Sequence, residues 1–105
     1  MGRFDGRVAL LTGAASGIGR ATALLMAADG AAIAGFDRDG VGLAAVAAEV
    51  ADAGGNMTTT VGDVSDRGCC RTAVDEAVSS HGRLDVLANI AGVSWSEHIA
   101  DATEE

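Results

Sequence analysis

A glycine-rich loop close to the N-terminus is the strongest indication of how this chain folds. It runs from Thr12 to Gly19 and follows a short apolar run, Val8 to Leu11, which is typical of a strand buried on both faces. It leads into Gly17 to Asp29, where apolar residues recur at spacings of three and four, as they do along a helix. A strand, a glycine-rich turn and a helix in this order predict the first unit of a parallel α/β sheet.

The rest of the chain repeats this alternation of strands and helices. Apolar and β-branched runs predict further strands at residues 31–36, 57–61 and 84–88. Amphipathic stretches predict helices at residues 41–53 and from a cap at Ser65 or Asp66 to about His81. The order β-α-β-α-β-α-β implies parallel strands joined by right-handed crossovers. We therefore expect a Rossmann-type parallel sheet with helices on both faces and the strand order 3-2-1-4.

Apolar residues recur at helical spacing in each of the three predicted helices. In the first helix the recurring residues are Ile18, Ala21, Leu24, Leu25 and Ala28. In the second they are Leu43, Val46 and Val50. In the third the inward-facing residues are expected to be Val74, Ala77, Val78 and His81.

The glycines of the loop suit a phosphate-binding turn. Gly13 allows the chain to turn sharply at the end of the strand, and Gly17 has no Cβ to keep a pyrophosphate away from the backbone. Gly19 allows the helix to pack closely on the strand. The free N–H groups and the dipole at the helix start then stabilise the negative diphosphate, and Ser16 adds a hydroxyl donor. The alternative is a tight turn that only links two elements.

Asp37 ends the second predicted strand and bears on the choice of dinucleotide. A carboxylate at this place accepts hydrogen bonds from the adenosine ribose hydroxyls and repels a 2′-phosphate, which favours NAD over NADP. The neighbouring Arg38 carries a guanidinium that could instead bind that phosphate. Asp37 could also be a plain turn residue, because it begins the run Asp-Arg-Asp-Gly. We expect NAD, with NADP as the weaker ligand.

Charge and composition bear on the class of partner. The chain of 105 residues carries a formal net charge of −8, and its seven basic residues are all Arg. Nucleic acid is an unexpected partner because no basic stripe is present. The polar N-terminus is unlike a signal peptide, and no apolar run spans a bilayer, so we expect a cytoplasmic protein without a membrane partner. The adjacent Cys69 and Cys70 have neither metal-ligand nor redox spacing, and we expect them to be ordinary helix residues.

Four motifs occur in an order that resembles the short-chain dehydrogenase/reductase family. They are Thr12-Gly13-x-x-x-Gly17-x-Gly19, Asp37, Asp63-Val64 and Asn89-x-Ala91-Gly92. The resemblance covers nearly the whole chain, and it departs from the family mainly at Ile90, where the family usually has a second Asn.

The resemblance implies a role for each matching residue. The pyrophosphate and nicotinamide side of NAD would contact Gly13, Ser16, Gly17, Ile18 and Gly19. The ribose would bind Asp37, the adenine would lie between Asp63 and Val64, and the fourth strand would line the cofactor with Asn89, Ala91 and Gly92. Without the resemblance, Asp63 would be interpreted as a turn or cap residue, and Asn89 as a partner of backbone groups at a strand end.

The family's catalytic residues are absent from this sequence. The resemblance implies hydride transfer between NAD(H) and an alcohol or carbonyl substrate, with a Tyr-x-x-x-Lys pair as the acid/base group. The chain contains no Tyr and no Lys. We therefore expect residues 1–105 to be a single NAD(P)-binding domain that is inactive alone and meets substrate only within a complete protein. The final Thr103-Glu104-Glu105 has the pattern of a helix start, so we expect a fragment truncated after the fourth strand.

Truncation at that point would leave an unpaired strand. We expect Val86, Leu87 and Ile90 to face solvent, and the chain to be marginally stable, to self-associate or to need a complementary chain. Two alternative functions stay open. One is a non-catalytic nucleotide-binding module that works with a partner chain. The other is a methyltransferase-like Rossmann domain, against which the three-residue gap between Gly13 and Gly17 and the polar loop both weigh.

Overall fold

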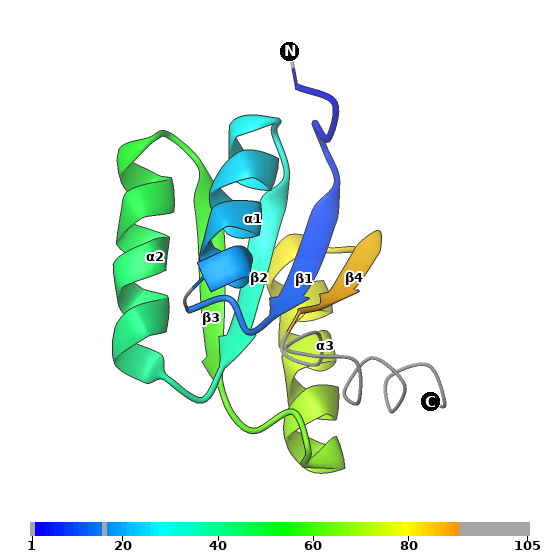
Figure 1. Ribbon diagram of the computed structural model, residues 1–105. Coiled ribbons are helices and arrows are strands. Elements are labelled where there is room, and N and C mark those ends of the chain that lie inside the picture. Colours follow the sequence, from blue (N-terminus) through cyan, green and yellow to red (C-terminus); the bar gives the residue numbers. More distant parts are fainter. Residues whose placement is uncertain (1, 16, 91–105) are drawn as a thin grey trace.

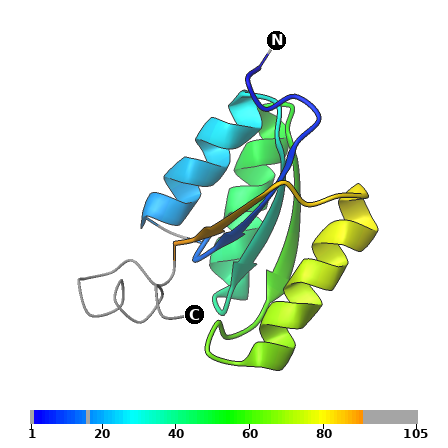
Figure 2. The ribbon, with the colours of Figure 1, turned by 90° about the vertical axis from the view of Figure 1, so that its right-hand side faces the viewer.

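The computed structural model describes residues 2–15 and 17–90 of the chain. In chain order the elements are β1 (Val8–Thr12), α1 (Gly17–Ala28), β2 (Ala32–Asp37), α2 (Gly40–Asp52), β3 (Asn56–Val61), α3 (Arg67–His81) and β4 (Val86–Asn89). The strands are parallel and lie in the order β3-β2-β1-β4. Helices α1 and α2 cover one face of the sheet and α3 covers the other (Figures 1 and 2). The predicted Rossmann-type fold and its strand order are confirmed.

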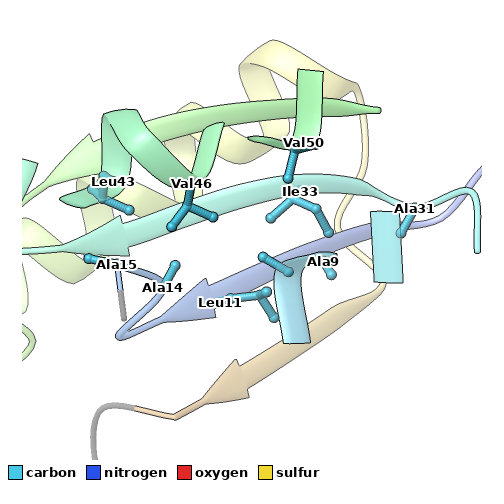
Figure 3. Packing of buried hydrophobic residues seen from close by; sticks show 10 residues of the cluster. Ala9, Leu11, Ala14, Ala15, Ala31, Ile33, Leu43, Val46 and Val50 are labelled. Carbon is cyan, nitrogen blue, oxygen red and sulfur yellow. The ribbon is translucent and has the colours of Figure 1, made fainter. Parts of the chain in front are cut away.

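The core is made of two apolar clusters, one on each side of the sheet. All five residues of β1 are buried, as expected of a strand covered on both faces. On the side of α1 and α2, Leu43, Val46 and Val50 point from α2 toward the sheet and pack with Ile33 (Figure 3). On the other side, α3 contributes Ala73 and Ala77, and the strands contribute Leu10, Ala34 and Phe36. With few aromatics, this core depends on close approach of small side chains.

Helix α1 does not turn most of its recurring apolar residues toward the sheet. Ile18 and Leu25 are 67% and 69% exposed, whereas Gly19 and Ala23 are buried. Of those recurring residues, Leu24 alone packs partly against the core, and Ala21 and Ala28 are exposed. The reason is that α1 approaches the sheet through its smallest residues, which leaves the larger ones on the outside. In α3, Ala73 and Ala77 face the sheet, but Val78 is exposed, which corrects the prediction for that residue.

Capping and side-chain hydrogen bonds fix α3 in place. Of the two predicted caps, Asp66 is the one used, and its carboxylate accepts from the N–H groups of Gly68 and Cys69. Near its end, His81 Nε2 lies 3.0 Å from Thr58 Oγ1 of β3. The hydroxyl of Thr60 donates to Glu76 at 2.7 Å. These contacts hold α3 along β3.

Strand β4 lies at the edge of the described sheet and begins two residues later than predicted. The segment before it is tied to β1 through Asp85, whose N–H donates to Val8 O and whose carboxylate accepts from Val8 N–H. As expected, Leu87 is exposed, at 61%. Val86 and Ile90 differ from the expectation, since both are partly buried against the cluster beneath α1.

Among the described helices, none is both long enough and apolar enough to cross a membrane.

Candidate functional site

The candidate site lies where the strands end at their carboxyl side. The chain leaves β1 toward α1 on one face of the sheet, whereas β4 is reached from α3 on the other face (Figure 1). In open α/β sheets a crevice forms outside the strand ends where the connections diverge in this way, and ligands bind there. Thr12, the last residue of β1, is paired in register with Phe36 of β2 and Asn89 of β4.

The glycine-rich loop turns tightly over the end of β2. The N–H of Gly13 donates to Phe36 O at 2.8 Å, and Gly13 has a φ of 68°, a conformation that favours glycine. A Cβ at Gly19 would lie 1.8 Å from the carbonyl oxygen of Gly13, so α1 touches the loop backbone directly. Gly17 has a φ of 57°, and a Cβ there would meet open space. Predicted site residue Ser16 lies outside the described residues.

The start of α1 differs from the starts of α2 and α3 in its charge. Asp39 caps α2 and Asp66 caps α3 with carboxylates that accept the first amide N–H groups. The residue before α1 is Ser16, and the first turn of α1, like those of α2 and α3, contains no acidic residue. Gly17 and Ile18 are exposed there. An incoming anion at α1 therefore meets no carboxylate from that turn.

Asp37 holds the loop, the end of β2 and the start of α2 together. Its Oδ2 accepts from the N–H of Ala15 at 3.0 Å, and its Oδ1 accepts from the N–H of Asp39 at 3.0 Å. Each carboxylate oxygen has a second lone pair that these two bonds leave unused. The turn role predicted as the alternative is therefore present, and the bond to Ala15 is an additional role that the sequence did not indicate.

Arg38 and Asp63 form an ion pair between the segments that follow β2 and β3. Arg38 Nη1 lies 3.5 Å from Asp63 Oδ2. Asp63 Oδ1 accepts from both the N–H and the hydroxyl of Ser65, at 2.9 and 2.8 Å. The Ser65 amide, the Ser65 hydroxyl and, more weakly, the charge of Arg38 lower the pKa of Asp63. Asp63 is therefore ionised at neutral pH.

Five of the predicted site residues line one cavity of about 200 Å³. It is bounded by Gly62 and by the predicted residues Gly13, Asp37, Arg38, Asp63 and Val64. The structure thus brings together residues from the ends of β1, β2 and β3. Ile18 and Gly19 lie on the adjoining first turn of α1.

Asn89 lies at a second, more apolar cavity of about 160 Å³ that shares Val64 with the first. Its Oδ1 accepts from the hydroxyl of Thr12 at 2.9 Å. Cys70 also lines this cavity, and its thiol donates to Val64 O at 3.2 Å. Burial, more than the nearby acidic groups, raises the pKa of this thiol. The predicted residues Ala91 and Gly92 lie outside the described part of the chain.

Two of these contacts were missed at the sequence level. Thr12 belongs to the glycine motif, but only the strand register shows that it reaches Asn89. Cys70 was expected to be an ordinary helix residue, and no spacing signal connects it to Val64. Within residues 2–15 and 17–90, no group of three His, Cys, Asp or Glu side chains could hold a metal ion.

A family profile and curated relatives match this chain, and they describe dehydrogenases, reductases or oxidoreductases. The profile of the family described as short chain dehydrogenase matches residues 7–105. The chain is 38% identical over 103 residues to a 3-oxoacyl-(acyl-carrier-protein) reductase of Thermotoga maritima, covering 98% of this chain and 42% of that protein. It is 44% identical over 92 residues to D-threitol dehydrogenase of Mycolicibacterium smegmatis, covering 88% of this chain and 35% of that one.

Solved structures agree with these matches. Carveol dehydrogenase from Mycobacterium avium, determined in complex with NAD, superposes with a TM-score of 0.79 at 35% identity, covering 83% of this chain and 36% of that structure. The chain spans about two fifths of the length of the curated relatives it matches. The matches do not favour the methyltransferase-like alternative.

Proposed function

Because this chain belongs to the short-chain dehydrogenase/reductase family, we propose that it binds a nicotinamide dinucleotide at the carboxyl ends of β1, β2, β3 and β4, with NAD preferred over NADP. The observation that carries the proposal is the fixed carboxylate of Asp37 at the rim of the 200 Å³ cavity. The bound NAD in the similar carveol dehydrogenase supports the same class of cofactor.

The diphosphate would lie against the start of α1. Backbone N–H groups at a helix start attract an anion. The residue before α1 is Ser16, whereas an aspartate precedes α2 and α3, and this difference supports the role. Open space in front of Gly17 leaves room for the phosphates. Ser16, Ile18 and Gly19 complete this part of the proposed site.

The adenosine half would occupy the cavity beyond the loop. The unused lone pairs of Asp37 would accept from the two ribose hydroxyls, and a 2′-phosphate at that place would face its negative charge. Asp63 and Val64 would lie beside the adenine. Asn89, Ala91 and Gly92 would line the path toward the nicotinamide.

We further propose that residues 1–105 form one cofactor-binding domain without catalytic activity of its own. The nicotinamide ring, when bound, supplies the hydride that is exchanged with an alcohol or carbonyl substrate. Proton transfer to the substrate oxygen would fall to a Tyr with a nearby Lys, and this chain contains neither residue. Substrate would therefore react only in a protein that adds these groups.

The proposal is tested by titrating the purified chain with NAD and NADP in a calorimeter. Asp37→Ala should weaken NAD binding about tenfold or more, the usual effect of losing hydrogen bonds to a charged group. NADP should lose less, since the variant also removes a repulsive charge. Asp37→Asn, which keeps an acceptor for the Ala15 N–H, should show the same change in preference.

Asp52→Ala serves as the matched control, because this exposed carboxylate lies at the end of α2 and should leave both affinities unchanged. Equal loss of NAD and NADP in the Asp37 variants would contradict the ribose assignment. Absence of dinucleotide binding by a folded sample would contradict the proposed function.

A further inference from the structure

The ion pair between Arg38 and Asp63 borders the cavity proposed for adenosine. Arg38 is the residue that could accommodate a 2′-phosphate, and its guanidinium is turned toward Asp63. We propose that Asp63 is a positioning residue that holds Arg38 away from the ribose and so contributes to rejection of NADP. This inference rests on the proposed dinucleotide site.

Asp63 is the fixed member of the pair and Arg38 the adaptable one. The Asp63 carboxylate is held at one oxygen by the amide and hydroxyl of Ser65, while its other oxygen faces Arg38. The Arg38 side chain is 77% exposed, and the ion pair is its one hydrogen bond within the described residues. The position of the guanidinium is therefore set by Asp63 rather than by packing around Arg38.

The charges around the cavity determine how this ion pair would affect binding of a 2′-phosphate. Asp37 and Asp63 each contribute one negative charge and Arg38 one positive charge, so the three side chains leave the cavity negative. A 2′-phosphate would have to compete with Asp63 for the guanidinium and would also face Asp37. When Asp63 is replaced by a neutral residue, the Arg38 side chain is free to turn toward the phosphate. A guanidinium binds phosphate oxygens in a bidentate manner.

The test compares NAD and NADP affinities of the folded chain by calorimetry. Asp63→Asn keeps the shape of the side chain and an acceptor for Ser65. It should raise the NADP affinity relative to the NAD affinity by up to about fivefold, in keeping with the modest strength of an exposed ion pair. Any change in the contact of residue 63 with the adenine affects both dinucleotides alike and leaves this ratio unchanged. Ser65→Ala, which leaves the charge but loosens Asp63, should move the ratio of the two affinities in the same direction by a smaller amount.

Two controls separate release of Arg38 from a general loss of negative charge. Asp39→Asn removes a neighbouring carboxylate that is not paired with Arg38, and it preserves the α2 cap because Asn is an equally good cap residue. It should leave the ratio nearly unchanged. In an Arg38→Ala background, Asp63→Asn should no longer raise the NADP-to-NAD affinity ratio.

An increase in the NADP-to-NAD affinity ratio that persists without Arg38, or that Asp39→Asn reproduces, would overturn the inference, as would an unchanged ratio in Asp63→Asn. In each of those cases the wild-type chain still binds NAD, and the proposed function stands. If the wild-type chain binds neither dinucleotide, both proposals fail together.

Discussion

Aspartate side chains in this acidic chain are largely used to hold backbone amides. Asp37, Asp39, Asp63, Asp66 and Asp85 each accept at least one main-chain N–H, at turns, helix starts and strand starts. Hydrogen bonds from amides to a carboxylate are stronger than neutral ones. The negative charge of the sequence is thus partly explained by local structure, and two of these residues also line the proposed adenosine cavity.

Asp85 makes the stability of the fold depend on pH. Hydrogen bonds from Arg83 and then from the Val8 amide lower its pKa below the ordinary value for an aspartate. A lowered folded-state pKa gives stability that is present above the unfolded value of about 3.9 and lost as pH falls through the folded value. Asp85→Asn should therefore unfold at a lower urea concentration than the wild type at pH 7, and the difference should shrink as the pH falls below the unfolded value.

The control for this prediction is Asp52→Asn, which changes an exposed carboxylate at the end of α2 and should follow the wild type across the pH range. A gap between Asp85→Asn and wild type that stays constant down to pH 2 would show that charge is not the cause.

At the scale of the elements, α1 and α2 contribute to the core in different ways. Leu43 of α2 is fully buried, whereas Leu25 of α1 is mostly exposed. Leu43→Ala should therefore lower the free energy of unfolding by about 2–5 kcal/mol, because it leaves a cavity. Leu25→Ala should change it by less than about 0.5 kcal/mol, as expected on a surface. Urea unfolding followed by circular dichroism measures both, and equal losses would contradict the observed face of α1.

This contrast shows why the sequence predicted the elements better than their faces. The glycine loop and the alternation of strands with helices determine topology, and these signals are local. Helix α1 is apolar on nearly every side, so its periodicity cannot distinguish the inner face from the outer one. The contact between Gly19 and the Gly13 carbonyl decides it, and that contact depends on the folded loop.

The candidate site was predictable to a similar degree. Asp37, Arg38 and Asp63 follow strand ends, so their gathering at one edge of the sheet follows from parallel topology. The pairing of Arg38 with Asp63 and the bond from Ala15 to Asp37 were not predictable, since both depend on turn conformations. Sequence reasoning therefore located the site without giving its internal connections.

For the whole molecule, β4 is one of the two edge strands of the described sheet, the other being β3. Leu87 is exposed on β4, and an apolar strand edge invites pairing with another chain. We propose that the 105-residue chain alone self-associates through this edge. Leu87→Lys should reduce the weight-average molar mass that analytical ultracentrifugation measures at high protein concentration, because a lysine on an edge strand opposes pairing between strands of two chains.

Val41→Lys is the matched control, since Val41 is 85% exposed on α2, away from β4. It should leave association unchanged. A wild-type chain that stays monomeric at all concentrations, or equal effects of the two lysines, would contradict an association through β4.

The two hydrogen bonds that Asp37 accepts from backbone N–H groups have a consequence for the kinetics of nucleotide binding. One carboxylate connects the loop after β1 to the entry into α2. These hydrogen bonds restrict the loop, so little conformational entropy should be lost when a nucleotide binds. Nucleotide association should therefore show a single fast kinetic phase, without a slower step in which the loop rearranges around the bound nucleotide.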